Sequence, residues 1–153
     1  MKIMMVCLGN ICRSPLAHGL LEHKIVQHSL SWSVDSSGTS GYHNGDPPDP
    51  RSIQEAAKHG LDISQQRSQQ FIASDLDDYD LILVMDSSNY QNVKRLAKNK
   101  IQENKIKLIL NYVFPAQNKP VPDPYYDGGF HLVYDLLDQA TDRIIEHYTA
   151  EDL

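Results

Sequence analysis

Residues 3–15, Ile3-Met4-Met5-Val6-Cys7-Leu8-Gly9-Asn10-Ile11-Cys12-Arg13-Ser14-Pro15, lead from an apolar run directly into a helical pattern. The apolar run predicts a buried strand, and Ser14 followed by Pro15 predicts the N-cap and first position of a helix. A strand that ends here would bring Cys7 to the carboxyl edge of a sheet. The following helix would direct unpaired N–H groups and its positive dipole end to the same point. The junction therefore predicts an anion site beside a thiol.

Strand-like and helical segments alternate along the rest of the chain. Further strands are expected at residues 32–36, 81–85 and 107–110, and helices at 50–57, 87–97 and 130–148. Asp49 and Asp86 are placed to cap two of these helices, and Gly60 is expected to stop the first of them. A proline-rich loop spans residues 115–124. This alternation predicts an α/β fold with a parallel sheet covered on both faces, in one domain over residues 1–153.

Composition restricts the partners that the protein can have. The formal net charge of -6 over 153 residues argues against a general nucleic-acid surface, which needs clustered Lys and Arg. No apolar run approaches the roughly 20 residues of a membrane span, and Met1-Lys2 leads into a strand rather than a signal peptide. Two cysteines do not make a disulfide framework. We expect a cytoplasmic protein with reduced thiols.

The five residues between Cys7 and Arg13 are enough to curl a loop around a tetrahedral oxyanion. Backbone N–H groups from residues 8–13 (Leu8, Gly9, Asn10, Ile11, Cys12 and Arg13) would point inward. The helix start and the Arg13 guanidinium both stabilise a thiolate, so Cys7 is predicted as a nucleophile. Arg13 can hold two phosphate oxygens, while Ser14 can hydrogen-bond the sulfur and help it to leave. Gly9 permits a tight bend, and Asn10 tolerates a left-handed backbone and can lock the loop.

Two simpler readings compete at this loop. A lone cysteine is most often a buried core thiol, but the joint placement of strand, bend, Arg-Ser pair and helix start disfavours that reading here. Metal binding by Cys7 and Cys12 is disfavoured because their spacing is unusual for zinc and no second ligand pair completes the site.

A thiolate that attacks a phosphate monoester needs an acid to protonate the leaving oxygen. The candidates are Asp46, Asp49, Asp86 and Asp123, and helix capping accounts for Asp49 and Asp86. Asp123 lies in Pro120-Val121-Pro122-Asp123-Pro124-Tyr125-Tyr126, where prolines stiffen the loop and two tyrosines can form an apolar wall. An ordinary Asp-Pro turn would explain Asp123 equally well on its own. Tyr42 could face Tyr125 across a cleft.

With Cys7, Arg13, Ser14 and the Asp123-Pro124-Tyr125-Tyr126 loop, the chain resembles the low-molecular-weight protein tyrosine phosphatases over essentially its whole length. The resemblance implies a four-stranded parallel sheet in a flavodoxin-like or Rossmann-like three-layer sandwich. It also implies phosphotyrosine-containing protein substrates, inorganic phosphate as product, no cofactor and no metal. A monomer or weakly self-associating protein is expected.

The resemblance also assigns roles to single residues. Cys7 forms a phosphocysteine, Arg13 binds phosphate, and Asp123 acts first as acid and then as base. Other positions match the network that supports the loop (Asn10, Ser14 and Ser36), the pocket walls (Leu8, Tyr42, Tyr125 and Tyr126) and a second loop cysteine, Cys12, that can pair reversibly with Cys7 on oxidation. One departure is Gln65, which stands where many members carry a histidine of the supporting network.

Three other functions stay open from the sequence. Arsenate reductases share the loop but use further cysteines, and residues 80–95 contain none. Protein-arginine phosphatases carry a threonine where this chain has Ile11, and the larger apolar side chain favours an aryl phosphate. A non-catalytic phosphotyrosine-binding module would need neither Cys7 nor Asp123.

Overall fold

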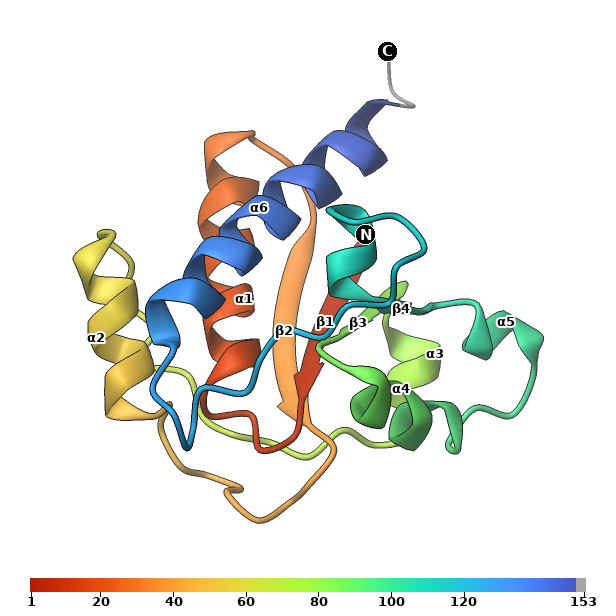
Figure 1. The fold of residues 1–153 in the computed structure, drawn as a ribbon. Helices are drawn as coiled ribbons and strands as arrows, with labels where there is room; N and C mark the ends of the chain where they lie inside the picture. The colour runs from red at the N-terminus through yellow and green to blue at the C-terminus, as the bar shows by residue number, and fades with distance from the viewer. Residues whose placement is uncertain (151–153) are drawn as a thin grey trace.

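The computed structural model describes residues 1–150, and a four-stranded sheet with helices on both of its faces forms its centre (Figure 1). The strands are β1 (Lys2–Cys7), β2 (Ser33–Gly38), β3 (Leu81–Val84) and β4 (Ile106–Leu108). They lie in the order β2-β1-β3-β4, and every neighbouring pair is parallel. The predicted fold class is therefore confirmed.

The two central strands are buried on both faces, which explains their unbroken apolar sequences. Ile3, Met5 and Cys7 pack into one core, whereas Met4 and Val6 pack into the other. Successive side chains of a strand point to opposite faces, so a sheet covered on both sides needs apolar residues at every position. This burial also fixes the register of β1 and holds Cys7 at the end of a rigid strand.

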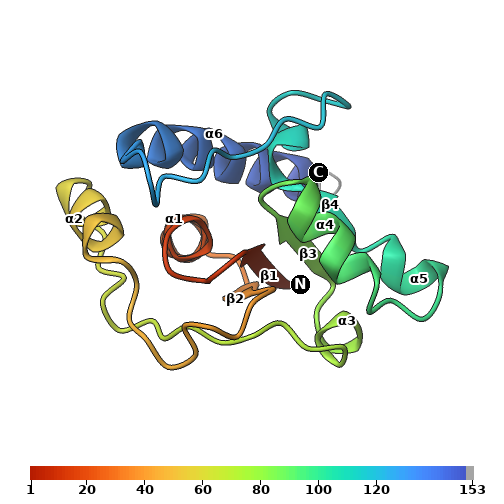
Figure 2. The same cartoon turned by 60° about the horizontal axis from the view of Figure 1, so that its bottom comes forward.

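Helices form the two outer layers (Figure 2). The helices α1 (Arg13–Gln27), α2 (Pro50–Lys58) and α6 (Phe130–Thr149) lie on one side of the sheet, with the short 3₁₀ helix η1 (Ile109–Tyr112) packed against α6. The short helices α3 (Asp75–Asp78), α4 (Ser87–Lys94) and α5 (Lys100–Glu103) lie on the other side. Within residues 1–150, no helix is both long enough and apolar enough to traverse a bilayer.

Several element boundaries differ from the sequence prediction. The helix α1 begins at Arg13 with Cys12 as its N-cap, so the prediction that Ser14 caps it is wrong. Ser14 is inside the first turn because its hydroxyl bonds other side chains of the loop. The capping predictions for Asp49 and Asp86 are confirmed, since the carboxylates accept from the N–H groups of Arg51 and Asn89.

The last strand and the basic helix are both shorter than predicted. The strand β4 ends at Leu108, where η1 follows, instead of continuing to residue 110. The helix α4 ends at Lys94 rather than at residue 97.

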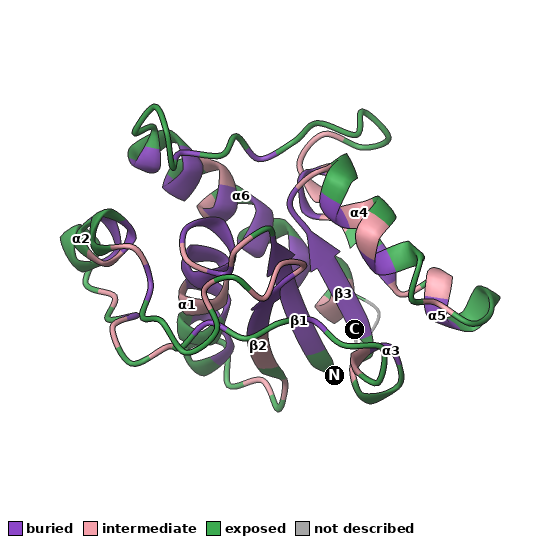
Figure 3. Cartoon of the chain, turned by 90° about the horizontal axis from the view of Figure 1, so that it is seen from below, coloured by how far each residue is buried: buried purple, intermediate pink, exposed green. Residues whose placement is uncertain are grey.

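The carboxyl ends of the strands meet at one edge of the sheet, which faces the viewer in Figure 3. The loop between β1 and α1, the segment after β2 and the start of α4 all lie there. In an open parallel sheet, ligands bind at this edge. The fold therefore brings Cys7, Gly38 and Asp86 to one place.

Candidate active site

A chain of hydrogen bonds ends on the sulfur of Cys7. The backbone N–H of Gln69 donates to Asn10 Oδ1 (3.0 Å), which turns Asn10 Nδ2 toward Ser14 Oγ (2.7 Å). Ser14 Oγ lies 3.0 Å from Cys7 Sγ. Ser14 Oγ already accepts from Asn10, so its own proton can be donated to the sulfur or to the Ser37 carbonyl, which lies 3.4 Å away. The chain therefore places a hydroxyl donor beside the sulfur at the end of β1.

The loop from Leu8 to Cys12 is bent at Asn10, whose φ is 57°. The prediction that Asn10 takes a left-handed backbone is confirmed, and its side chain bridges Gln69 and Ser14 as expected of a residue that locks the loop. A Cβ at Gly9 would lie 3.1 Å from His43 Cδ2, so the glycine allows close packing. Among the described residues, the N–H groups of residues 9–12 donate to no acceptor of the protein. These groups, at the start of α1, can bind an anion.

Two neighbouring segments hold this loop from outside. The hydroxyl of Ser68 donates to the carbonyl of Gly9 at 3.0 Å, next to the bond from Gln69. On the β2 side, Gly38 touches the loop so closely that a Cβ there would lie 2.7 Å from the Leu8 carbonyl oxygen. The loop conformation thus depends on residues that are far away in sequence.

Arg13 is only 3% exposed and has two firm partners. Its Nη1 donates to Asp86 Oδ2 (2.8 Å) and to the carbonyl of Val121 (3.0 Å). Burial opposes the guanidinium charge, but Cys7 and the hydrogen-bonded Asp86 outweigh it and raise the pKa of Arg13. A permanently charged guanidinium is therefore fixed in position beside Cys7.

Asp123 comes to the same place from the proline-rich loop. Its Oδ2 lies 3.8 Å from Arg13 Nη2, and its side chain is 40% exposed. Its Oδ1 accepts the N–H of Tyr125 (3.1 Å), which orients the carboxylate. Arg51 on α2 steadies this loop, since its Nη2 donates to the Tyr125 carbonyl (3.1 Å) and its guanidinium lies 5.6 Å from the Tyr125 ring centre.

These groups line a cavity of about 490 Å³. Cys7, Arg13 and Asp123 contribute to it, together with Leu8, Gly9, Ile11, Cys12, Ser40, Tyr42, His43, Tyr125 and Tyr126. The rings of Tyr125 and Tyr126 meet edge to face, with centres 4.9 Å apart, and Tyr42 contacts His43 in the same way. The cavity has an anion-binding floor and aromatic walls, so it can hold an aryl phosphate.

Cys12 lies next to this floor as a buried free thiol. Burial, followed by the charges of Asp49 and Cys7, raises the pKa of Cys12 to about 12. Its carbonyl accepts a hydrogen bond from Ser52 Oγ (3.3 Å) at the start of α2. At neutral pH, Cys12 is therefore a neutral thiol.

Among the described residues, the side chains of two residues expected in the supporting network make no hydrogen bond to the loop. The Ser36 hydroxyl lies 3.0 Å from His18 Nδ1, and Ser36 reaches the network only through its carbonyl, which accepts from Gln69 Nε2 (3.0 Å). Gln65 is exposed, with its amide 3.5 Å from Ser64 Oγ. Gln69 takes the supporting position instead.

Sequence reasoning missed the contact between Asp86 and Arg13. The capping role is real, but Asp86 uses Oδ1 for the cap and Oδ2 for Arg13. Its place directly after a buried strand, at the carboxyl edge, was the signal that pointed to the site. Asp46 is not part of the cavity lining and lies 3.2 Å from His43 Nδ1.

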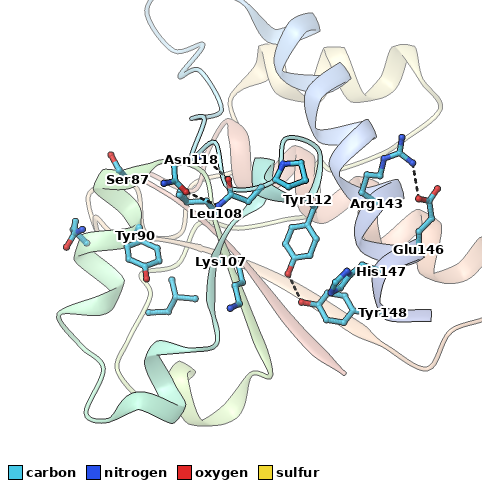
Figure 4. Close-up of a pocket in the computed structure, with 14 residues that line it drawn as sticks. Ser87, Tyr90, Lys107, Leu108, Tyr112, Asn118, Arg143, Glu146, His147 and Tyr148 are labelled. Atoms are coloured by element: carbon cyan, nitrogen blue, oxygen red, sulfur yellow. Dashed lines mark hydrogen bonds and ion pairs between the residues drawn. The ribbon is translucent and has the colours of Figure 1, made fainter. Parts of the chain in front are cut away.

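A larger cavity of about 980 Å³ lies beside β4 and the last turns of α6 (Figure 4). Its labelled side chains include Tyr112 and Tyr148, whose hydroxyls are hydrogen-bonded to each other. Burial, aided by Tyr148, raises the pKa of Tyr112, so that hydroxyl is neutral at physiological pH. The lining contains no cysteine, so this cavity is separate from the one that holds Cys7, Arg13 and Asp123.

Comparison with known proteins agrees with this geometry. Residues 2–152 match the family of low molecular weight phosphotyrosine protein phosphatases. A putative low molecular weight protein-tyrosine-phosphatase of Synechocystis is 42% identical over 149 residues, which cover 95% of this chain and 94% of the relative. The chain belongs to the low molecular weight phosphotyrosine protein phosphatase family.

Solved structures of similar proteins share the whole fold. The protein tyrosine phosphatase of Entamoeba histolytica superposes with a TM-score of 0.92 at 34% identity, covering 100% of this chain and 99% of that one. A Drosophila arginine phosphatase is also similar, with a TM-score of 0.90 and 32% identity over 97% of this chain and 98% of that one. The fold of this phosphatase family is thus shared by proteins named for different phosphorylated residues.

Proposed function

We propose that this protein is a protein tyrosine phosphatase that hydrolyses phosphotyrosine in proteins through a phosphocysteine, without metal or cofactor. The observation that carries the proposal is the convergence of the Cys7 sulfur, the Arg13 guanidinium and the Asp123 carboxyl on one cavity with tyrosine walls. A binding module would need neither a nucleophile nor an acid. Family membership supports the same reaction class.

In the first step, the Cys7 thiolate attacks phosphorus as the bond to the phenol oxygen breaks. The N–H groups of residues 8–13 and the fork of Arg13 hold the phosphoryl oxygens, whose charge spreads in the transition state. Protonated Asp123 gives its proton to the departing oxygen. The products of this step are free tyrosine hydroxyl and a phosphocysteine.

In the second step, water attacks the phosphocysteine and the sulfur leaves. Asp123, now a carboxylate, takes a proton from the water. The Ser14 hydroxyl, 3.0 Å from Cys7 Sγ, stabilises the departing thiolate. Inorganic phosphate is released, and Asp123 ends the cycle protonated as it began.

Steady-state kinetics with p-nitrophenyl phosphate and phosphotyrosine peptides test this proposal. Cys7→Ser should abolish turnover, and undiminished turnover would refute the mechanism. Asp123→Asn should lower kcat by about 10²- to 10⁴-fold with a phenyl ester whose leaving group is poor, because proton transfer to that group is lost. An unchanged rate would remove Asp123 from the acid role.

The named relatives make phosphoarginine the second substrate to test. The similar Drosophila protein is called an arginine phosphatase, and Ile11, which is half-buried and lines the cavity, is the residue by which the sequence favours aryl phosphates. A panel of phosphotyrosine, phosphoserine, phosphoarginine and arsenate separates the alternatives. Arsenate reduction is disfavoured because the chain has two cysteines, both at this site.

We also propose that oxidation regulates the site reversibly. Peroxide would convert the Cys7 thiolate to a sulfenic acid with release of hydroxide, and Cys12 would then displace water to form a disulfide. Oxidation removes the charge of Cys7, which is one cause of the raised Cys12 pKa. After peroxide treatment, dithiothreitol should restore the parent more fully than Cys12→Ser; equal recovery would contradict the proposal. Because the proposed cycle needs both thiols reduced, it is compatible with a cytoplasmic location. That the protein is a monomer or self-associates weakly stays a prediction.

A further inference from the structure

A second group of chemically able side chains lies outside the catalytic cavity, between α2 and α6. Glu55 is on α2 and His59, one turn later, is its C-cap, while His131 is in the first turn of α6. Figures 1 and 2 show α2 beside the first turns of α6. One ligand atom from each of the three residues lies within 4.8 Å of the other two.

The centre of this group is a single buried carboxylate oxygen. Glu55 is 4% exposed, and its Oε2 lies 2.9 Å from His59 Nε2 and 3.3 Å from His131 Nδ1. Burial raises the pKa of Glu55, but hydrogen bonds from the two imidazoles outweigh it and leave that pKa below its usual value. Lys58 Nζ is a distant third partner, 3.9 Å from Oε1.

The surroundings orient both imidazoles. His131 Nε2 lies 3.4 Å from Asp135 Oδ2, so the ring is held between two carboxylates. The His59 ring stacks on Tyr134 with centres 3.7 Å apart and planes 8° apart. A carboxylate on the far nitrogen of a histidine ring is the usual outer partner of a metal-binding imidazole, because it fixes the tautomer and makes the ring a better donor.

We propose that Glu55, His59 and His131 bind a divalent transition metal of the zinc class, and that this ion joins α2 to α6. Two imidazoles and one carboxylate, with water as the fourth ligand, form a donor set that zinc accepts. Tetrahedral ligands about 2.0–2.1 Å from zinc are roughly 3.3 Å apart, close to the distances from Glu55 to the two histidines. The two imidazole nitrogens, which lie within 4.8 Å of each other, would be brought to the same spacing by side-chain rotation.

The position of the site gives the ion a role in stability rather than in the reaction. None of its three residues lines the catalytic cavity. Both joined helices nevertheless adjoin that cavity: the N–H of Asp49, at the cap of α2, donates to the Ile11 carbonyl (2.8 Å), and α6 starts at Phe130, directly after the Asp123 loop. The ion would therefore tie together two elements that flank the catalytic groups.

Zinc binding is measured by competition with a chromophoric chelator in a Cys7→Ser/Cys12→Ser background, because thiolates also bind zinc. Parent protein alkylated at Cys7 serves as a second background if the double variant folds poorly. We expect one zinc ion per chain. His131→Gln, at a side chain that is 69% exposed, should weaken binding by at least about 100-fold, and Asp135→Asn by about 10-fold. His28→Gln, at an exposed histidine outside the group, is the matched control.

Thermal unfolding gives an independent readout of the same site. Zinc should raise the Tm of the background protein and leave the Tm of His131→Gln unchanged, because only a ligand that binds the folded state stabilises it. His59→Gln should behave like His131→Gln. Absence of zinc binding in the thiol-free background, or binding by both histidine variants as tight as that of the background protein, would overturn the proposal. Neither result would bear on the phosphatase reaction.

Discussion

The guanidinium of Arg13 and the carboxylate of Asp86 form a 2.8 Å ion pair between residues 73 positions apart in the sequence. Parallel pairing of β1 with β3 brings the two residues together, since each follows the carboxyl end of its strand. One carboxylate oxygen caps α4 while the other holds Arg13. Helix capping and arginine positioning are thus joined in one side chain.

Replacing Asp86 by Asn separates these two functions. Asparagine caps helices about as well as aspartate, so the free energy of unfolding should change little. The variant loses the carboxylate charge that offsets the cost of burying the Arg13 guanidinium. We therefore expect kcat/KM for p-nitrophenyl phosphate to fall about 10- to 100-fold, since hydrogen bonds to charged groups contribute roughly 1.5–3 kcal/mol. Kinetics and urea unfolding measure both effects. Full activity would show that Val121 alone holds the guanidinium.

Removing the Ser14 hydroxyl should slow the release of sulfur in the second step. In Ser14→Ala, a leaving thiolate loses its hydrogen-bond donor, so kcat should fall about 10-fold while phosphocysteine accumulates. Stopped-flow measurements with p-nitrophenyl phosphate should then show a burst of phenolate. Ser88→Ala, at an exposed position on α4, is the control and should behave like the parent. A loss of rate without a burst would place the effect of Ser14 in the first step.

Gly38→Ala should disturb the loop without touching any reacting group. A Cβ at this position would lie 2.7 Å from the Leu8 carbonyl oxygen and 3.0 Å from the Asn10 nitrogen, and both are backbone atoms. We expect about 1–3 kcal/mol of destabilisation and a clear loss of kcat. Gly60→Ala, with φ of 79° and open space around it, should cost about 1 kcal/mol without lowering kcat. Equal kcat values for the two variants would contradict this argument.

Alkylation should distinguish the two cysteines by pH. Burial raises the pKa of Cys12 to about 12, so its thiolate is scarce at pH 7.5 and iodoacetamide should label Cys7 alone. Labelling of Cys12 should increase about tenfold per pH unit up to pH 10, because thiolate is the reactive form. Between about pH 8.5 and 12, the unfolded chain loses a proton that folded Cys12 keeps, so this thiol makes stability fall as pH rises. Peptide mass mapping, with denatured protein as control, measures the labelling.

Ile11 provides a test of substrate choice. In Ile11→Thr, part of the apolar contact with an aryl ring is lost, so kcat/KM for phosphotyrosine should fall about 10-fold relative to that for phosphoarginine. The ratio of the two constants is compared in parent and variant. Val26→Thr, at an exposed position on α1, should leave the ratio unchanged. An unchanged ratio in Ile11→Thr would mean that this position does not select the leaving group.

The sequence by itself determined the elements that depend on local periodicity and capping. The unbroken apolar runs at residues 3–6 and 81–84 indicated strands buried on both faces, and Asp49 before Pro50 marked a helix start. The spacing of Cys7 and Arg13 and the Asp123 loop indicated an oxyanion site with a nucleophile and an acid. These signals are local because hydrogen bonding, chain stiffness and side-chain alternation act over a few residues.

Only the tertiary structure decided which distant groups hold the loop. The sequence predicted Ser14 as a helix cap, but its hydroxyl is hydrogen-bonded to the sulfur of Cys7 instead. The side chain of Asn10 holds that hydroxyl, and the backbone N–H of Gln69 holds Asn10. Gln65, expected to support the loop, is exposed. Strand order brings Gly38 against the loop and Asp86 against Arg13. The order β2-β1-β3-β4 is set by the burial of two cores at once, which is a property of the whole chain. The nucleophile could therefore be predicted from its neighbours in sequence, and its support required the packed fold.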